Sequence, residues 1–88
     1  MNYYENEHGK DIREWFMEEM PKEWIVISMF NALKYSVRAG KKEGNTQLQD
    51  YAKMDNYLED YIALTGMEAN EVYDLLDNMV DQFNNYDN

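Results

Sequence analysis

Residues 38–50, RAGKKEGNTQLQD, decide how this chain folds, because they hold the end of one predicted helix and the start of the next. Gly40 is a natural residue to end a helix, since it adopts the left-handed terminating conformation at the least cost. Residues 41–45 are too polar to be anything but a connection. Thr46 and Gln49 fit the capping-box pattern that begins a helix. The stretch therefore predicts the turn of an antiparallel helical hairpin.

Two helices are predicted before this turn, because apolar residues recur there at three- and four-residue spacing. The longer one covers residues 22–39 and the shorter one residues 11–20, and Pro21 between them suits the first turn of a helix. The expected inward face of the longer helix is Ile25, Met29, Ala32, Leu33, Ser36 and Val37, and that of the shorter helix is Ile12, Trp15, Phe16 and Met20.

Two more helices are predicted after the turn, one from Thr46 to Gly66 and one that Thr65 and Glu68 could cap. The expected inward face of the first is Leu48, Tyr51, Leu58, Tyr61 and Ile62, with Asp55 as an awkward member, and that of the second is Val72, Leu75, Leu76, Met79, Val80 and Phe83. Nothing in the chain has the pattern of a strand. The sequence predicts an all-α fold, a three- to four-helix bundle built on a central antiparallel helical hairpin.

Three parts follow one another along this 88-residue chain. We expect a flexible N-terminal arm over residues 1–9, a helical core with a basic hairpin turn over 10–65, and an acidic C-terminal helix over 66–88. The chain has no cysteine, so a disulfide or thiolate site is excluded. It has no apolar run near the ~18 residues that span a bilayer, and its start lacks the layout of a signal peptide. The sequence therefore predicts no membrane partner.

Charge is distributed very unevenly. The formal net charge is −10, yet residues 34–53 hold five of the eight basic residues and only two acids. We call this segment the basic island; it sums to +3, and the rest of the chain sums to −13. So negative an exterior repels nucleic-acid backbones, which argues against direct nucleic-acid binding. It favours instead a protein with a basic surface as the partner, or a surface that imitates nucleic acid.

The basic island has a structural interpretation. Lys34, Arg38 and residues 41–42 line one face of a helix, because they recur at four- and three- to four-residue spacing. A hairpin would bring Asp50 and Asp55 within reach of this ridge. Arg38 and Lys34 would then pair with these carboxylates, while residues 41–42 offset the negative end of the helix.

A functional interpretation of the same island stays open beside it. The free N–H groups near Thr46 would attract an anion, and Gly44 would let the backbone approach it. Such a site could bind a nucleotide or a cyclic nucleotide, with Tyr35 or Tyr51 stacked on the base. The candidate residues are Lys34, Tyr35, Arg38, Lys41, Lys42, Thr46 and Lys53. No cofactor is expected, except Mg²⁺ held by Asp50 or Asp55 if the site transfers phosphate.

The last 22 residues hold six acids and no base. Their carboxylates could imitate a row of DNA phosphates and dock on the basic groove of a nuclease or other enzyme. The candidate residues are Glu71, Asp74, Asp77, Asp81 and Asp87. The alternative is an ordinary solvated helix face. No metal site is expected, because one helix displays its carboxylates too far apart to converge on an ion.

One segment resembles a known family. The string Asn31-Ala-Leu-Lys34-Tyr35-x-x-Arg38-Ala39-Gly40-Lys41-Lys42, followed by Leu48-x-Asp50-x-x-Lys53-x-x-x-Tyr57-Leu58, is similar to the core signature of small phage-encoded proteins of unknown function, often labelled nucleotide kinase-like. The resemblance covers roughly residues 10–62. It implies a phage origin and a helical hairpin. The absence of cysteine suits a reducing cytoplasm, which for a phage protein is that of the infected host cell.

Catalytic groups are scarce. The single histidine, His8, lies in the predicted arm, and the chain has no nucleophile motif such as G-x-S-x-G. We therefore expect no catalytic residue and favour a binding protein over an enzyme. The leading hypothesis is an acidic protein that engages and inhibits or modulates a host enzyme, a defence or nucleic-acid-processing factor. The alternatives are the nucleotide-binding or phosphotransfer module and a homo-oligomer formed through the aromatic residues.

Overall fold

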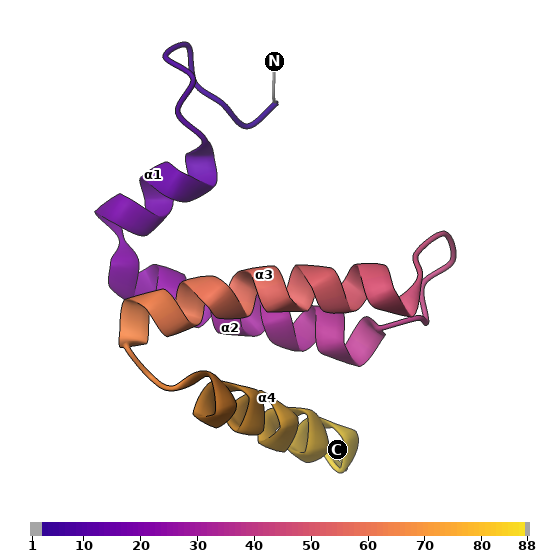
Figure 1. The fold of residues 1–88 in the computed structure, drawn as a ribbon. Helices are drawn as coiled ribbons and strands as arrows, with labels where there is room; N and C mark the ends of the chain where they lie inside the picture. The colour runs from indigo at the N-terminus through magenta and orange to yellow at the C-terminus, as the bar shows by residue number, and fades with distance from the viewer. Residues whose placement is uncertain (1–2, 88) are drawn as a thin grey trace.

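The computed structural model describes residues 3–87, which form helices joined by turns and loops (Figure 1). The helices are α1 (Ile12–Glu19), α2 (Pro21–Arg38), α3 (Gln47–Thr65) and α4 (Ala69–Asn84). Residues 3–87 contain no strand beyond one isolated bridge between Glu5 and Asp11. The predicted all-α fold is therefore confirmed. No helix of this part of the chain is long and apolar enough to cross a membrane.

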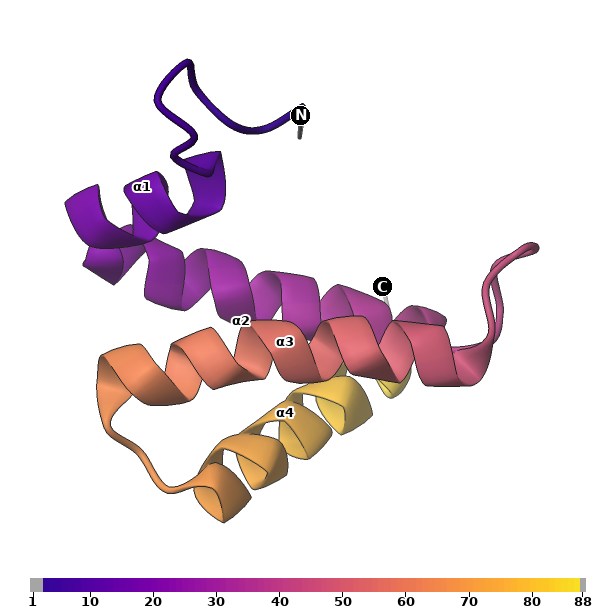
Figure 2. The same ribbon diagram turned by 45° about the horizontal axis from the view of Figure 1, so that its top comes forward.

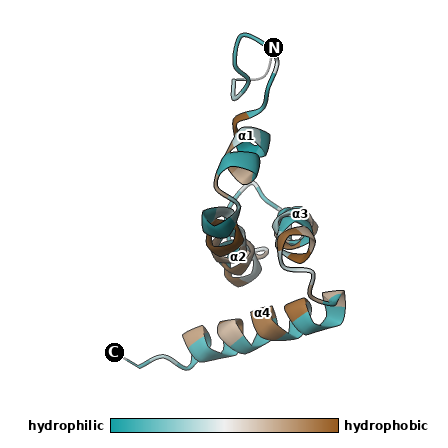
Figure 3. Cartoon of the chain, turned by 90° about the vertical axis from the view of Figure 1, so that its left-hand side faces the viewer, coloured by the Kyte–Doolittle hydropathy of each residue, from teal (hydrophilic) through white to brown (hydrophobic). Residues whose placement is uncertain are grey.

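The helices α2 and α3 lie side by side and antiparallel, and they form the central hairpin (Figures 1 and 2). The helix α4 packs across both of them. Figure 3 shows α4 on one side of the hairpin and α1 on the opposite side. The predicted hairpin is thus the centre of the molecule, and the two flanking helices are attached to different sides of it.

Local sequence signals set the helix ends around the hairpin. Gly40 follows the last residues of α2 with a φ of 76°. A side chain there would also bring its Cβ to 3.3 Å from Cβ of Gln47, so glycine is required for two reasons. Thr46 Oγ1 accepts the Gln49 N–H at 3.1 Å, and Gln49 Oε1 accepts the Thr46 N–H at 2.8 Å. Gly66 ends α3 with a φ of 72°. All three predictions are confirmed.

The predicted cap of α4 is wrong. Thr65 is still the last residue of α3, so its hydroxyl donates to the Tyr61 carbonyl at 2.7 Å instead of capping the next helix. The same hydroxyl oxygen accepts the Met67 N–H at 3.3 Å. Glu68 takes the N-cap position of α4 and makes no side-chain capping hydrogen bond.

The core is small and is built from α2, α3 and α4. Its buried apolar residues are Trp24, Met29, Ala32, Met54, Leu58, Val72 and Leu76. Four of them, Met29, Ala32, Val72 and Leu76, were predicted to lie on the inward faces of α2 and α4. None of the residues of α1 is buried. The hairpin and α4 therefore hold the core, and α1 is an attachment to it.

The predicted inward face of α3 is wrong at its start. Leu48 is 80% exposed, and Tyr51 is also exposed. The true inward stripe passes through Asp50, Met54 and Leu58, which follow one another at four-residue spacing. The prediction failed because a carboxylate occupies the first core position of this helix.

Other predicted inward residues are also exposed. Ile12 and Trp15 face solvent because α1 projects beyond the hairpin (Figure 1). Phe83, in the last turn of α4, is exposed as well. At the amino terminus, residues 5–11 close a turn in which Asn6 Oδ1 accepts the backbone N–H groups of His8 and Lys10. The flexibility expected of residues 1–9 stays a prediction, and residues 1 and 2 lie outside the described part.

Candidate functional site

The turn of the hairpin presents two lysines to solvent. The Lys41 N–H donates to the Arg38 carbonyl at 2.7 Å, and the Asn45 N–H donates to the Lys42 carbonyl at 3.2 Å. These two consecutive turns reverse the chain between α2 and α3. Lys41 and Lys42 are both exposed there.

Below this turn lies a buried ion pair. Asp50 is fully buried in the first turn of α3. Its Oδ1 accepts from Arg38 Nη2 at 2.9 Å, and its Oδ2 accepts the Gly40 N–H at 3.3 Å. A buried carboxylate is costly unless it is paired and hydrogen-bonded, so Arg38 and the turn together stabilise this charge. The predicted pairing of Arg38 with Asp50 is confirmed.

The pKa of Asp50 reflects these contacts. The hydrogen bond from Arg38 lowers the pKa of Asp50 below its ordinary value, while burial acts in the opposite direction. The Gly40 N–H and the positive charges of Arg38 and Lys53 lower this pKa further. Asp50 is therefore ionised at neutral pH despite its burial.

Three cations surround the ring of Tyr35. Lys34 Nζ lies 4.8 Å from the ring centroid, Arg38 Cζ 4.6 Å and Lys53 Nζ 5.3 Å. The ring also stacks on Tyr57, with 6.1 Å between the centroids and 14° between the planes. Cation–π attraction therefore accounts for the convergence of the basic island on one aromatic side chain. A nucleotide base could stack on Tyr35 only by displacing one of these neighbours.

The predicted pair between Lys34 and Asp55 does not form. Asp55 Oδ1 instead accepts from the Tyr73 hydroxyl at 2.5 Å, and this bond fastens α4 to α3. Burial, followed by the bond to Asp55, raises the pKa of Tyr73 to about 12. Within residues 3–87, Lys34 and Lys53 form no ion pair with a carboxylate. Both lysines are exposed beside Tyr35, and among residues 3–87 no carboxylate lies within ion-pair distance of either ammonium group.

The aromatic stacking continues from Tyr57 towards α1. Trp24 lies 6.2 Å from Tyr57, and Phe16 lies 5.8 Å from Trp24. Arg13 Cζ lies over both central rings, 4.4 Å from the centroid of Tyr57 and 5.6 Å from that of Trp24. We call this row the cation–aromatic ladder. Its members are Phe16, Trp24, Tyr57 and Tyr35, with Arg13, Lys34, Arg38 and Lys53 against the rings.

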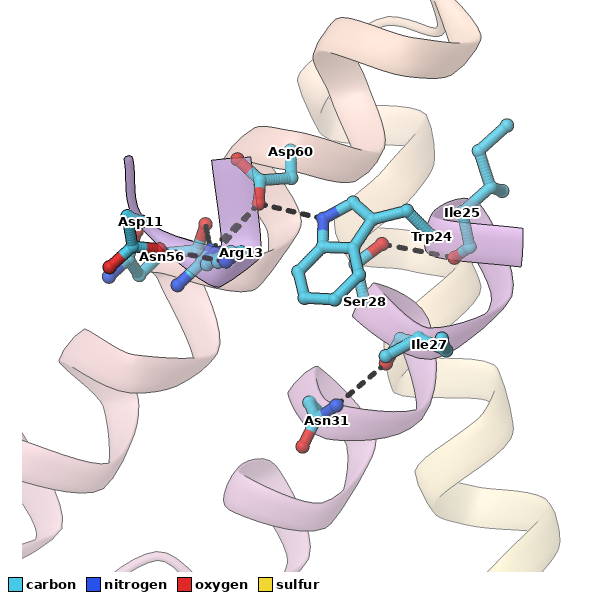
Figure 4. Close-up of polar contacts among 9 residues, drawn as sticks. All are labelled: Asp11, Arg13, Trp24, Ile25, Ile27, Ser28, Asn31, Asn56 and Asp60. Carbon is cyan, nitrogen blue, oxygen red and sulfur yellow. Dashed lines mark hydrogen bonds and ion pairs between the residues drawn. The ribbon is translucent and has the colours of Figure 1, made fainter. Parts of the chain in front are cut away.

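One carboxylate fastens the end of the ladder (Figure 4). Asp60 Oδ2 accepts from Arg13 at 2.8 and 3.1 Å and from Trp24 Nε1 at 2.9 Å. Arg13 also donates to the Asn56 carbonyl at 3.2 Å. A single arginine thus holds α1 against α3. Sequence reasoning missed Arg13, because its partner Asp60 is 47 residues away and no local pattern connects the two.

The structure separates the predicted anion-binding residues into two groups. It brings Lys34, Tyr35, Arg38 and Lys53 together on the ladder. Lys41, Lys42 and Thr46 lie instead at the end of the hairpin, where the Thr46 hydroxyl is occupied as a helix cap.

The carboxylates of α4 form the other candidate surface. Glu71, Asp74, Asp77 and Asp81 are all exposed, and we call them the acidic face. Figure 3 shows the hydrophilic side of α4 turned away from α2 and α3. None of the ion pairs within residues 3–87 involves this helix. Asp87, the fifth predicted residue, is exposed beyond the end of α4.

The described part of the chain has no cluster of metal-binding side chains. Residues 3–87 contain no group of three or more acidic or histidine side chains placed to hold one metal ion. The acidic face is thus a row of separate carboxylates.

These features define a small all-α protein with a cation–aromatic ladder on its hairpin and an acidic helix beside it. The protein family of unknown function called DUF3310 matches residues 2–59, and the chain belongs to this family. The chain is also similar to the "SaV protein" of Lactococcus phage SK1, with 38% identity over 60 residues, 64% of this chain. The match spans only 44% of that phage protein. No solved structure matches the chain.

The family match covers one of the two candidate surfaces but not the other. All eight members of the ladder lie inside residues 2–59, whereas the acidic face lies outside them. The expected family of small proteins of unknown function, with a relative from a phage, is confirmed. The nucleotide kinase-like label stays a prediction.

Proposed function

We propose that this protein is an acidic binding protein that engages a host enzyme through the acidic face of α4. The observation that carries this proposal is the row of four exposed carboxylates on α4, with no cation paired to any of them within residues 3–87. Uncompensated charge of one sign attracts a surface of the opposite sign and speeds its association. The partner that fits is a host protein with a basic groove.

The spacing of the carboxylates supports the imitation of nucleic acid. Glu71 and Asp81 are ten residues apart, so the row extends over about 15 Å of helix axis. Four charges over that length have a spacing of the same order as the phosphates of one DNA strand, which recur about every 3.4 Å. A host enzyme that normally holds DNA or RNA offers a matching row of basic side chains.

The helix that carries the row is held rigidly. Val72 and Leu76 are buried in the core, and Tyr73 is bonded to Asp55. Because the carboxylates are already arranged before binding, little conformational entropy is lost when a partner docks. The similarity to a phage protein supports a host factor as the target.

A pull-down from host-cell lysate tests the proposal with two matched variants. The first variant neutralises the acidic face by Glu71→Gln, Asp74→Asn, Asp77→Asn and Asp81→Asn. The control removes four exposed charges elsewhere, by Glu5→Gln, Glu7→Gln, Glu14→Gln and Glu43→Gln. We expect the wild type and the control to retain a nucleic-acid-binding protein at low salt and the first variant to lose it. Added duplex DNA should displace the captured protein.

Two results would overturn this proposal. One is equal retention by the wild type and the variant without the acidic face. The other is retention that duplex DNA does not reduce, since a mimic must compete with the molecule that it imitates. DNA binding by this protein itself is measured first, because DNA that bound it directly would also release the captured protein.

A second candidate function rests on the two lysines beside Tyr35. Lys34 and Lys53 converge on one ring without a carboxylate partner, so a phosphate group could bridge them. The site would take a nucleotide or a cyclic nucleotide, with Mg²⁺ if a triphosphate binds. A thermal-shift series with each nucleotide at millimolar concentration tests it. A shift that disappears in Lys34→Ala/Lys53→Ala supports the site, and unchanged melting with every nucleotide rejects it.

A further inference from the structure

The helix α2 carries an apolar stripe of which only Leu33 packs against the core. Val26, Phe30, Leu33 and Val37 follow one another at spacings of four, three and four residues, the pattern of a helix–helix seam. Val26 is 69% exposed and Phe30 is 62% exposed. The first half of the stripe is therefore open to solvent, although the stripe has the spacing that packs against another helix.

Residues of α4 extend this stripe into a groove. Leu75, Met79 and Phe83 line its second wall. Two adjoining cavities of about 380 and 400 Å³ form the groove, and Phe30 and Leu33 line both of them. We call it the apolar groove. Nearly all of its lining is hydrophobic, and Lys34 and Arg38 stand at one end.

The total surface of the chain is larger than a compact monomer needs. A monomer of 10.6 kDa is expected to expose about 5,500 Å². This chain exposes 6632 Å². The excess is of the same order as the ~800 Å² that each partner buries in a standard protein interface.

Charge along α2 indicates which partner fits. Acids stand near its start, at Glu19 and Glu23, whereas bases stand near its end, at Lys34, Arg38 and residues 41–42. Two copies of α2 in antiparallel orientation would place the acidic end of each against the basic end of the other, twice. A parallel pair would bring like charges together. Such self-complementarity is the requirement of a two-fold symmetric interface.

We propose that the apolar groove binds a second copy of this chain, with the two α2 helices antiparallel across a two-fold axis. With Phe30 against Leu33 of the second copy, Glu23 lies opposite Gly40 of that copy, one residue before Lys41. Helical periodicity places Asp74 and Asp81 nearly opposite Met79 around α4. The aspartates of the acidic face therefore stay outside the interface, and only Glu71, one turn before Leu75, lies at its edge. This proposal can therefore fail or hold independently of the proposed function.

Analytical ultracentrifugation tests the dimer. As the concentration of the 88-residue chain is raised towards about 1 mM, we expect its sedimenting mass to reach about twice 10.6 kDa. Phe30→Glu places a charge in the groove and should produce a monomer. Leu48→Glu is the matched control, because Leu48 is even more exposed but lies on α3 away from the groove. It should leave the dimer intact.

A charge swap tests the orientation. Glu23→Lys should raise the dimer dissociation constant roughly tenfold, because two symmetric contacts change at once. The double variant Glu23→Lys/Lys41→Glu should restore it. A wild type that stays monomeric up to about 1 mM, or a Phe30→Glu variant that still dimerises, overturns the interface. A double variant no tighter than Glu23→Lys overturns the antiparallel arrangement.

Discussion

At the scale of single residues, Asp50 is unusual because it is a fully buried carboxylate. It occupies a core position where Met54 and Leu58 take the following places in the same stripe. Its charge is compatible with burial because Arg38 and the Gly40 N–H satisfy its two oxygens. Such a pair fixes the register of α2 against α3, because a shift of either helix would separate Asp50 from Arg38 and from the Gly40 N–H.

Removing Arg38 should therefore be costly. We expect Arg38→Ala to lower the melting temperature by about 10 °C or more, because it leaves a buried carboxylate unpaired. The double variant Arg38→Met/Asp50→Leu should recover most of that loss, since apolar side chains can replace a buried pair. Circular dichroism melts measure both variants. A melt of Arg38→Ala within two or three degrees of the wild type would contradict this role.

The lowered pKa of Asp50 predicts an acid-sensitive fold. Because the carboxyl titrates at a lower pH in the folded state than its unfolded value of about 3.9, its stabilising effect is present above that value. It is lost as the pH falls through the folded pKa. Melting temperatures measured from neutral to strongly acidic pH should drop as the pH falls below about 3.9. The variant Asp50→Asn should show a smaller drop. Identical acid profiles for both proteins would contradict the prediction.

Tyr73 predicts sensitivity at the alkaline end. Its pKa is raised to about 12 in the folded state, against about 10 when unfolded. Its stabilising effect is therefore complete below pH ~10 and is lost as the pH rises towards 12. Tyr73→Phe should remove this alkaline loss and one late phenolate from the absorbance titration. A titration in which all tyrosines ionise together near their ordinary value would exclude the raised pKa.

At the scale of the helices, short-range signals predicted most of the fold. Gly40, Thr46 and Gly66 act on their own neighbours, so the ends of α2 and α3 could be found from the sequence. The same holds for half of the site, because four-residue spacing and the hairpin bring Lys34 and Arg38 to Tyr35. What could not be predicted depends on distant partners: the contact of Arg13 with Asp60 places α1, and no local pattern contains it.

Arg13 should control the attachment of α1. We expect Arg13→Ala to remove about 1–3 kcal/mol, the usual worth of hydrogen bonds to a charged group. The amide hydrogens of α1 should then exchange much faster, while those of α3 stay protected. Lys22→Ala is a suitable control, because Lys22 is exposed at the start of α2. Unchanged exchange in α1 would show that Arg13 does not hold this helix.

At the scale of the whole molecule, α4 belongs to the core although the family match ends before it. Val72 is fully buried and Leu76 nearly so, against the hairpin. The acidic face is therefore carried by a helix that packs on the same hairpin as the ladder, and a force applied to α4 would act on the hairpin as well.

Leu76 tests whether α4 docks in solution. Leu76→Ala should lower the free energy of unfolding by about 2–5 kcal/mol, because it leaves a cavity among α2, α3 and α4. Asn78→Ala, at an exposed position of the same helix, should change it little. Chemical denaturation measures both. If the two variants unfold alike, α4 does not pack on the hairpin.

The two tryptophans differ in solvent exposure, so their fluorescence can report the position of α1. Trp24 is 8% exposed and bonded to Asp60, whereas Trp15 is 49% exposed on α1. Iodide should quench the emission of Trp15 readily and that of Trp24 hardly at all. Detachment of α1 would expose the shielded indole, so the quenched fraction follows that motion without any added dye.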